Sequence, residues 1–245
     1  MATARFRFYE ELNDFLDSPH RKCEFEYGCA REATVKQAIE ALGVPHTEVE
    51  LILVNGVSVD FAYRLRDADR VSVYPRFESF DVRSLLRLRP EPLRKSRFIA
   101  DAQLGGLARL LRMLGFDTLH DHAWSDHHIV ELALQQSRII LTRDRELLKI
   151  RTVTHGCYVH ALEPTAQAKE ILERLQLAAA VRPFTLCLCC NAAVTPIEKE
   201  KIIDRLPPTV ARLHEEYYAC GGCGRVYWKG SHWQRMQARL GEILA

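Results

Sequence analysis

Polar and apolar side chains alternate at the start of the chain. Residues 5–9, Arg-Phe-Arg-Phe-Tyr, have the period of two that is typical of a half-exposed strand. Residues 34–43 instead carry apolar side chains at helical spacing, with Thr34 as the N-cap and Gly43 as the C-cap. Further strands are predicted over 49–54 and 69–75, and the Asn55-Gly56 pair predicts a tight hairpin after the first of them. This order favours a small α+β unit such as a β-grasp.

From residue 97 the pattern changes to strands that alternate with helices. The predicted strands are 97–101, 116–120, 138–142 and 157–160, and the predicted helices are 103–114, 126–136, 145–149 and 165–177. Repeated βα units indicate a parallel, doubly wound sheet. From about 183 the chain becomes irregular and rich in cysteine, and a helix is expected over 232–244.

The two patterned regions are separated by a basic segment with two prolines. We expect it to be a linker, which is either simply solvated or lies beside a phosphate site of the next domain. The expected domains are therefore 1–78 (β-grasp), 79–96 (linker), 97–182 (α/β domain) and 183–245 (cysteine-bearing segment and final helix).

Composition places the chain among globular proteins. It has 245 residues, of which 47% are hydrophobic and 27% charged, enough for two or three small domains. No apolar run has the length of a membrane span or of a signal peptide, so we expect no membrane association and a cytoplasmic location. The net charge of +2 does not by itself indicate nucleic-acid binding, and the excess of basic residues lies after residue 90.

Four of the eight cysteines form two C-x-x-C pairs, Cys187/Cys190 and Cys220/Cys223. Two such pairs can close a tetrahedral zinc site, and four thiolates leave no open position, so the predicted Zn²⁺ is structural. A redox dithiol is the alternative, although it does not explain two copies. No role is assigned to the remaining cysteines, Cys23, Cys29, Cys157 and Cys189.

Candidate catalytic acids follow the predicted strands. Asp101 and Asp144 each end a strand and begin a helix, and Asp126 begins another helix. Each could be only an N-cap. If the three converge at one edge of the sheet, they would need a divalent cation, and oxygen ligands favour Mg²⁺ or Mn²⁺. Such a site suits the hydrolysis of a phosphodiester.

Positive and aromatic side chains accompany these candidates. Arg109 and Arg112 are expected on the polar face of helix 103–114, and Arg143 adjoins Asp144. They either form a solvated surface or bind phosphate oxygens. The aromatic residues within 226–233 either stack on nucleobases or cover the core of a small ribbon.

The motifs of residues 98–240 resemble the Mut-seven-C (Mut7-C) RNase family. They are Phe98-Ile-Ala-Asp101, Leu104-Gly-Gly-Leu-Ala-Arg109-Leu-Leu-Arg112, Leu114-Gly-Phe-Asp117, Ile140-Leu-Thr-Arg-Asp144, Cys187-x-x-Cys190-Asn191, Cys220-x-x-Cys223-Gly and Tyr227-Trp-x-Gly230-Ser-His232. The resemblance implies a PIN-like nuclease domain with a zinc ribbon, and metal-dependent RNA cleavage by acids that match Asp101 and Asp144. Asp126 is taken as the third acid, and Asp121 and Glu146 are candidates for a fourth.

The N-terminal region is similar to the ubiquitin-like, sulfur-carrier-related domain that precedes this nuclease. The similarity rests on Phe6-Arg-Phe-Tyr-Glu-Glu-Leu-Asn13, Val54-Asn-Gly56 and Asp69-Arg-Val-Ser-Val-Tyr-Pro75. Sulfur carriers act through a C-terminal Gly-Gly, which the continuing chain lacks at Arg76-Phe77 and at its last residues, so a role in docking a protein partner is expected instead.

Two hypotheses of different class follow. The first is a cytoplasmic endoribonuclease in which Asp101, Asp126 and Asp144 hold Mg²⁺ or Mn²⁺, Arg109, Arg112 and Arg143 hold phosphates, and a zinc ribbon helps to seat RNA. The second is a non-catalytic RNA-binding adaptor that uses the ribbon and the basic linker, with the acids as helix caps. A redox protein that uses the C-x-x-C pairs is a third alternative.

Overall fold

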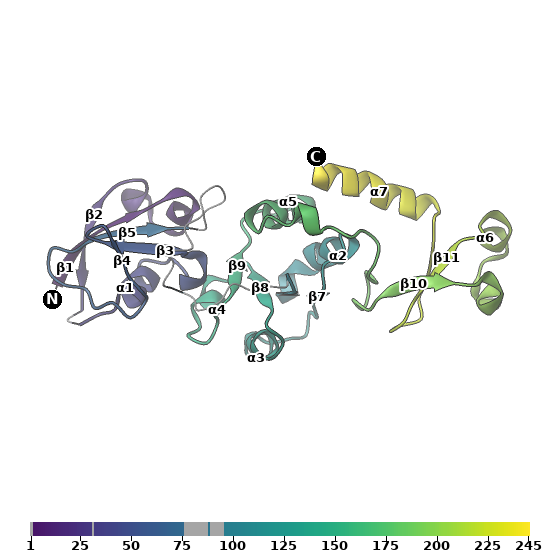
Figure 1. The fold of residues 1–245 in the computed structure, drawn as a ribbon, viewed down its shortest axis with the longest axis horizontal. Helices are drawn as coiled ribbons and strands as arrows, with labels where there is room; N and C mark the ends of the chain where they lie inside the picture. Colours follow the sequence, from purple (N-terminus) through teal and green to yellow (C-terminus); the bar gives the residue numbers. More distant parts are fainter. Residues whose placement is uncertain (1, 31, 76–87, 89–95) are drawn as a thin grey trace. The chain divides into compact units, whose positions relative to one another are not determined.

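The computed structural model describes residues 2–30, 32–75, 88 and 96–245 (Figure 1). The chain divides into two compact units, Met1–Lys95 with Asp126–Tyr158, and Ser96–Ser125 with Val159–Ala245. Except for Leu88 and Ser96, the predicted linker 79–96 lies outside the described residues.

The first unit begins with a five-stranded sheet in the order β2-β1-β5-β3-β4. Its strands are β1 (Ala2–Phe8), β2 (Phe25–Cys29), β3 (Leu51–Val54), β4 (Val57–Ser58) and β5 (Arg70–Tyr74). Strands β1 and β5 are parallel, and the other pairs are antiparallel. Helix α1 (Val35–Ala41) packs on the sheet through Val35, Ala38 and Ile39. This arrangement confirms the predicted β-grasp.

Local signals explain the helix and the hairpin of this sheet. Thr34 and Gln37 form a reciprocal capping box, in which the Thr34 hydroxyl accepts from the Gln37 N–H and the Gln37 side chain accepts from the Thr34 N–H. Asn55 and Gly56 have φ angles of +52° and +83°, the left-handed pair that a two-residue hairpin needs. Strand β2 was not predicted, although its apolar residues Phe25, Tyr27 and Cys29 alternate with Glu26 and Gly28; all five residues pair with β1.

The remainder of the first unit contains α3 (Asp126–Gln136), β8 (Ile139–Thr142), α4 (Arg145–Lys149) and β9 (Gly156–Tyr158). Strands β8 and β9 are parallel, with Thr142 opposite Tyr158. The predicted helices 126–136 and 145–149 are confirmed at both ends.

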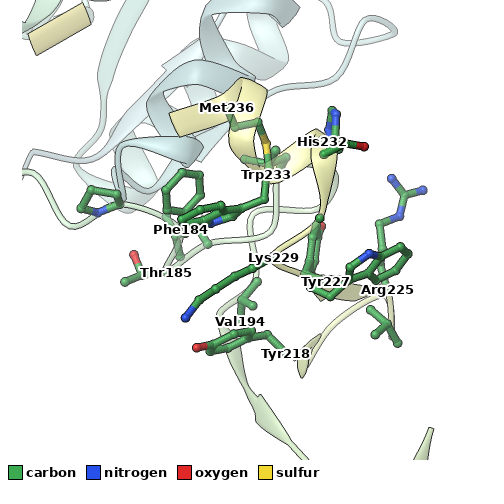
Figure 2. A pocket seen from close by; sticks show the side chains of 17 residues that line it. Phe184, Thr185, Val194, Tyr218, Arg225, Tyr227, Lys229, His232, Trp233 and Met236 are labelled. Atoms are coloured by element: carbon green, nitrogen blue, oxygen red, sulfur yellow. The ribbon is translucent and has the colours of Figure 1, made fainter. Parts of the chain in front are cut away.

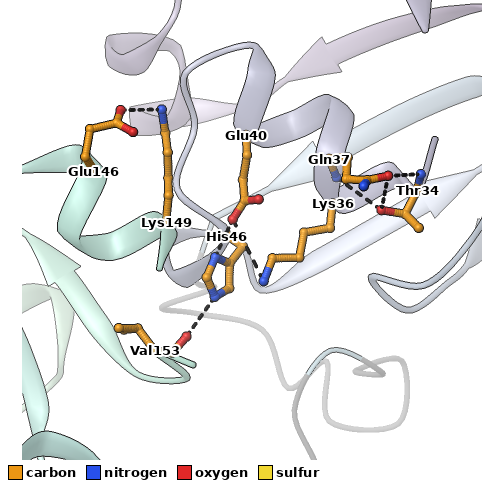
Figure 3. Close-up of polar contacts among 8 residues, drawn as sticks. All are labelled: Thr34, Lys36, Gln37, Glu40, His46, Glu146, Lys149 and Val153. Atoms are coloured by element: carbon orange, nitrogen blue, oxygen red, sulfur yellow. Dashed lines mark hydrogen bonds and ion pairs between the residues drawn. The ribbon is translucent and has the colours of Figure 1, made fainter. Parts of the chain in front are cut away.

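Buried polar contacts join the β-grasp to this second part of the unit (Figure 3). His46 is 5% exposed; its Nδ1 lies 2.7 Å from a Glu40 carboxylate oxygen, and its Nε2 lies 2.7 Å from the Val153 carbonyl oxygen. Glu48, equally buried, accepts a 2.5 Å hydrogen bond from the N–H of Tyr158 in β9. The Arg145 guanidinium donates to the Phe15 carbonyl and lies over the Phe15 ring.

The second unit contains β6 (Phe98–Ala100), a 3₁₀ turn (Ala102–Leu104), α2 (Gly105–Met113), β7 (Thr118–Leu119) and α5 (Pro164–Arg174). Strands β6 and β7 are parallel. Gly106 permits the close packing of α2 on α5, because a Cβ there would lie 2.7 Å from the Pro164 ring. The parallel pairs of both units agree with the predicted α/β class.

The rest of the second unit is a small antiparallel sheet, β10-β11-β12, followed by a helix. Its elements are β10 (Val194–Ile197), α6 (Pro208–Leu213), β11 (Tyr217–Cys220), β12 (Val226–Trp228) and α7 (Ser231–Leu244). The buried core of this sheet consists of Ile202, Leu206 and Tyr217. Tyr217 is anchored by its hydroxyl, which donates to the Val210 and His214 carbonyls.

Across the described part of the chain, every helix is too short or too polar to cross a bilayer.

A candidate zinc centre and the predicted nuclease residues

The two C-x-x-C pairs come together. The ligand atoms of Cys187, Cys190, Cys220 and Cys223 lie within 4.8 Å of one another, with 3.7 Å between the Cys187 and Cys223 sulfurs and 3.3 Å between those of Cys190 and Cys220. Sulfurs that surround zinc tetrahedrally at about 2.3 Å are separated by about 3.8 Å. The cysteine group therefore suits a zinc ion in both chemistry and size.

The same backbone device closes both knuckles. Asn191 follows Cys190 with φ +67°, and Gly224 follows Cys223 with φ +69°. The Asn191 N–H donates to the Cys187 carbonyl at 2.9 Å, and the Gly224 N–H donates to the Cys220 carbonyl at 3.0 Å. Asparagine and glycine are the residues that adopt this left-handed conformation most readily. The full local signal is therefore C-x-x-C-N and C-x-x-C-G.

Hydrogen bonds favour the thiolate form at Cys187. Burial opposes ionisation, but a hydrogen bond from the Tyr227 hydroxyl, 2.9 Å from the sulfur, and bonds from the backbone N–H groups of Cys190 and Cys189 outweigh it and lower the pKa of Cys187 to about 6. Burial and then the bond to Cys187 raise the pKa of Tyr227. A ligand held as thiolate at neutral pH can bind zinc without first losing a proton.

Arg112 does not lie on the solvated face of α2 where its spacing suggested. It is 5% exposed; its Nε donates to the Thr118 carbonyl at 2.8 Å, and its Nη1 donates to the Leu188 and Cys189 carbonyls at 3.1 and 2.9 Å. Burial lowers the pKa of Arg112, whereas the neighbouring cysteines raise it. The predicted helical periodicity is correct. A cationic side chain can nevertheless point into the protein interior when carbonyl groups accept its hydrogen bonds, so periodicity alone gives the wrong side for Arg112. Arg112 thus holds the first knuckle against α2 and β7.

A second polar link at the knuckle escaped the sequence reasoning. The Asn191 amide donates to Asp117 at 2.6 Å and accepts from the Thr118 N–H at 2.9 Å, and Asp117 also pairs with Arg97 at 3.0 Å. The motifs contain both Asn191 and Asp117, but nothing in their spacing indicates that they touch. Together with Arg112, these contacts tie the cysteine cluster to β7.

Two of the three candidate acids cap the start of a helical turn. Asp101, 6% exposed, accepts from the Ala102 N–H at 2.6 Å at the end of β6. Asp144 follows β8 and accepts from the Glu146 N–H at 2.8 Å. Asp126 is the exposed first residue of α3. Asp101 belongs to the second unit and the other two to the first, so their grouping around one cation stays a prediction.

The neighbours of these acids differ in role. Asp121 accepts from the Ala123 N–H at 2.9 Å, and Glu146 pairs with Lys149 at 2.8 Å, so both proposed fourth acids have local partners. Arg109 is exposed on α2, as predicted, and Arg143 is partly exposed. His120, a residue that sequence reasoning did not select, follows β7 and lies 3.2 Å from the Ala102 carbonyl, beside the turn that Asp101 caps.

Comparison with known families identifies both regions of the chain. Residues 96–240 match the Mut7-C RNase domain, and residues 1–81 match the Mut7-C ubiquitin domain. The first match spans more than half of the chain. The protein belongs to the Mut7-C RNase family. Its Mut7-C RNase domain includes Asp101, Asp126, Asp144 and all four clustered cysteines.

Among solved structures, the chain is similar to two crystal structures of small archaeal modifier protein 1 from Haloferax volcanii. The identities are 16% and 15%, and the alignments cover 31% and 32% of this chain and 100% of the other chain, each with a TM-score of 0.26. No curated protein matches the chain.

Proposed function

We propose that this protein is a metal-dependent endoribonuclease that uses Asp101, Asp126 and Asp144 to bind a catalytic Mg²⁺ or Mn²⁺. The match of residues 96–240 to an RNase domain carries the proposal, because that region contains all three acids. Asp101 and Asp144 also share one local setting, since each lies within two residues of the end of a parallel strand and caps the helical turn that follows. Ligands of α/β proteins bind at such strand ends.

Carboxylate and guanidinium side chains each support the hydrolysis of a phosphodiester. A bound Mg²⁺ or Mn²⁺ would activate water and offset charge on the leaving oxygen. Carboxylates are suitable ligands because both cations prefer oxygen. The exposed Arg109 and the partly exposed Arg143 are suited to phosphate oxygens, which accept two hydrogen bonds from a guanidinium. Arg112 has no part in this step, since carbonyl groups occupy it.

Three further assignments belong to the same proposal. The cysteine group holds a structural Zn²⁺, because four thiolates leave no position for water or substrate. The N-terminal β-grasp docks a protein partner, and the enzyme acts in the cytoplasm on RNA. The match to a ubiquitin domain supports the docking role.

The catalytic assignment predicts that Asp101→Asn and Asp144→Asn each reduce RNA cleavage at least 100-fold in Mn²⁺, because each removes one charged ligand of the activating cation. A labelled circular RNA is the substrate, since only an endonuclease opens a closed circle. Asp60→Asn is the matched control: Asp60 is an exposed acid that accepts from the Ala62 N–H at 2.9 Å, a local role like that of Asp101.

Three results would contradict the proposal. If both variants retain wild-type cleavage, the acids are helix caps only. If the wild-type protein binds RNA without any turnover, the protein is an adaptor. Cleavage of linear RNA alone would exclude an endonuclease.

A further inference from the structure

A cavity of about 600 Å³ lies in the second unit next to the cysteine cluster (Figure 2). It is lined by residues 183–186 and 188, by Val194 and Tyr218 of the small sheet, and by residues 225–233 and 236. Its volume is within the usual range of ligand sites, roughly 300 to 1,000 Å³. Neither the predicted acids nor the cysteine sulfurs line it, so it is a separate feature of the unit.

Aromatic rings form much of the wall of this cavity. Phe184 and Trp233 lie with ring centroids 5.9 Å apart at an interplanar angle of 42°. Figure 2 shows these two rings on one side of the Lys229 side chain and Tyr218 on the other. All three rings are only partly buried. Trp228 also lines the cavity, but part of its ring packs against the buried core of the small sheet β10-β11-β12.

The rings have fixed supports. The Phe184 N–H donates to the Met113 carbonyl at 2.9 Å, which attaches this wall to the end of α2. Tyr218 lies in β11, paired with Tyr227 of β12, and the Tyr227 hydroxyl contacts Cys187 of the cysteine cluster. A platform held in place before binding loses little side-chain entropy when a flat ligand stacks on it.

The charge of the lining is positive. Arg225 and Lys229 line the cavity, and no carboxylate does so among the described residues. Lys229 is partly neutralised, because its ammonium lies 2.6 Å from Glu216. Arg225 is exposed, and no acidic partner accompanies it in the described part of the chain. The lining therefore contains an exposed guanidinium in addition to the aromatic rings.

We propose that this cavity binds an unpaired nucleobase of single-stranded RNA, with its 5′ or 3′ phosphate on Arg225. Stacking rings with a nearby cation are the recurring means by which proteins hold single-stranded nucleic acid. The proposal rests on the proposed function for its choice of RNA as ligand, and it adds a place where the substrate strand is gripped. A duplex cannot use the site, because its bases are already stacked and paired.

A proline-rich peptide is the other class of ligand that prefers aromatic grooves. The composition of the lining favours RNA, because a guanidinium in it serves a phosphate and has no partner in an apolar peptide.

Fluorescence anisotropy with a labelled eight-nucleotide oligoadenylate tests the inference. The full chain carries Asp144→Asn in all samples, so that the probe survives. Tyr218→Ala, Trp233→Ala and Arg225→Gln are each expected to weaken binding, by about 5- to 100-fold for the two aromatic variants. Tyr218→Phe keeps the ring and is expected to bind as the parent does. The probe is also expected to quench tryptophan emission, since Trp228 and Trp233 line the cavity.

Arg239→Gln is the matched control for Arg225→Gln, because Arg239 is an exposed arginine of α7 that does not line the cavity. It is expected to leave affinity nearly unchanged. Zinc content and circular dichroism identify any variant that has lost its fold. Among the folded variants, the difference in affinity between Tyr218→Phe and Tyr218→Ala measures the contribution of the ring.

The inference is overturned if the three cavity variants bind the probe as tightly as Arg239→Gln, if a blunt eight-base-pair duplex binds as well as the single strand, or if an oligoproline peptide binds where RNA does not. These outcomes are independent of catalysis. Loss of cleavage in Asp101→Asn with unchanged binding by cavity variants would retain the nuclease and reject the cavity site, whereas cavity-dependent binding by a protein without turnover would do the reverse.

Discussion

At the scale of single residues, Arg112 shows how a cation can serve structure rather than substrate. Its guanidinium is almost fully buried and donates to carbonyls on both sides of the contact between β7 and the first knuckle. Hydrogen bonds from a charged donor are stronger than neutral ones, and carbonyls left without a donor are costly. Its positive charge would also offset the net negative charge of a zinc ion bound by four thiolates.

We predict that Arg112→Leu lowers the free energy of unfolding by about 3 kcal/mol and speeds the loss of zinc to a chelator, because one buried and two part-buried carbonyls lose their donor. Chemical denaturation and a colorimetric zinc-release assay measure the two effects. Arg109→Leu, on the exposed side of the same helix, is expected to change stability by less than about 0.5 kcal/mol. Equal effects of the two substitutions would contradict the structural role.

At the scale of elements, the β-grasp is not an independent appendage of its unit. Two buried side chains of the 3₁₀ helix His46–Glu48 make contacts with the rest of the unit: His46 contacts the turn before β9, and Glu48 contacts β9. In addition, Arg145 of α4 donates to the Phe15 carbonyl of the β-grasp. Such contacts between segments about 100 residues apart leave no periodic signal in the sequence. The secondary structure on each side was nevertheless predictable from its own pattern.

We predict that Glu48→Ala destabilises the first unit by about 1 to 3 kcal/mol, because the Tyr158 N–H loses its acceptor in a largely buried contact. Hydrogen exchange at the Tyr158 amide should accelerate with it. The control is Glu26→Ala, which removes an exposed pair with Arg5 at 3.5 Å and is expected to have almost no effect. Unchanged exchange at Tyr158 in Glu48→Ala would show that the contact is not formed in solution.

At the scale of the whole molecule, the compact units do not follow the order of the sequence. The stretch 97–182, expected to be one domain, contributes 126–158 to the first unit and the remainder to the second. The cysteine-bearing ribbon, residues 183–228, has a core of only three buried residues, too few to stabilise about 45 residues without further support. Metal binding is therefore expected to supply much of its folding free energy.

We predict one zinc ion per chain, and that its removal unfolds the ribbon while the β-grasp remains folded. A structural zinc site contributes on the order of 10 kcal/mol, which the ribbon core cannot replace. Hydrogen exchange with and without a strong chelator should show lost protection in β10, β11 and β12 and retained protection in β1 and β5. Full protection of the ribbon without zinc would contradict a structural metal.

The sequence by itself determined the features that depend on neighbours along the chain. The Thr34 cap, the Asn55-Gly56 turn, the helices other than α6 and the paired knuckles all follow from local conformational preference, so their residues could be named in advance. Only the tertiary structure decided which way Arg112 points and that separate segments enclose an aromatic cavity. These features depend on burial and on partners distant in sequence, and spacing along one helix or strand carries no record of them.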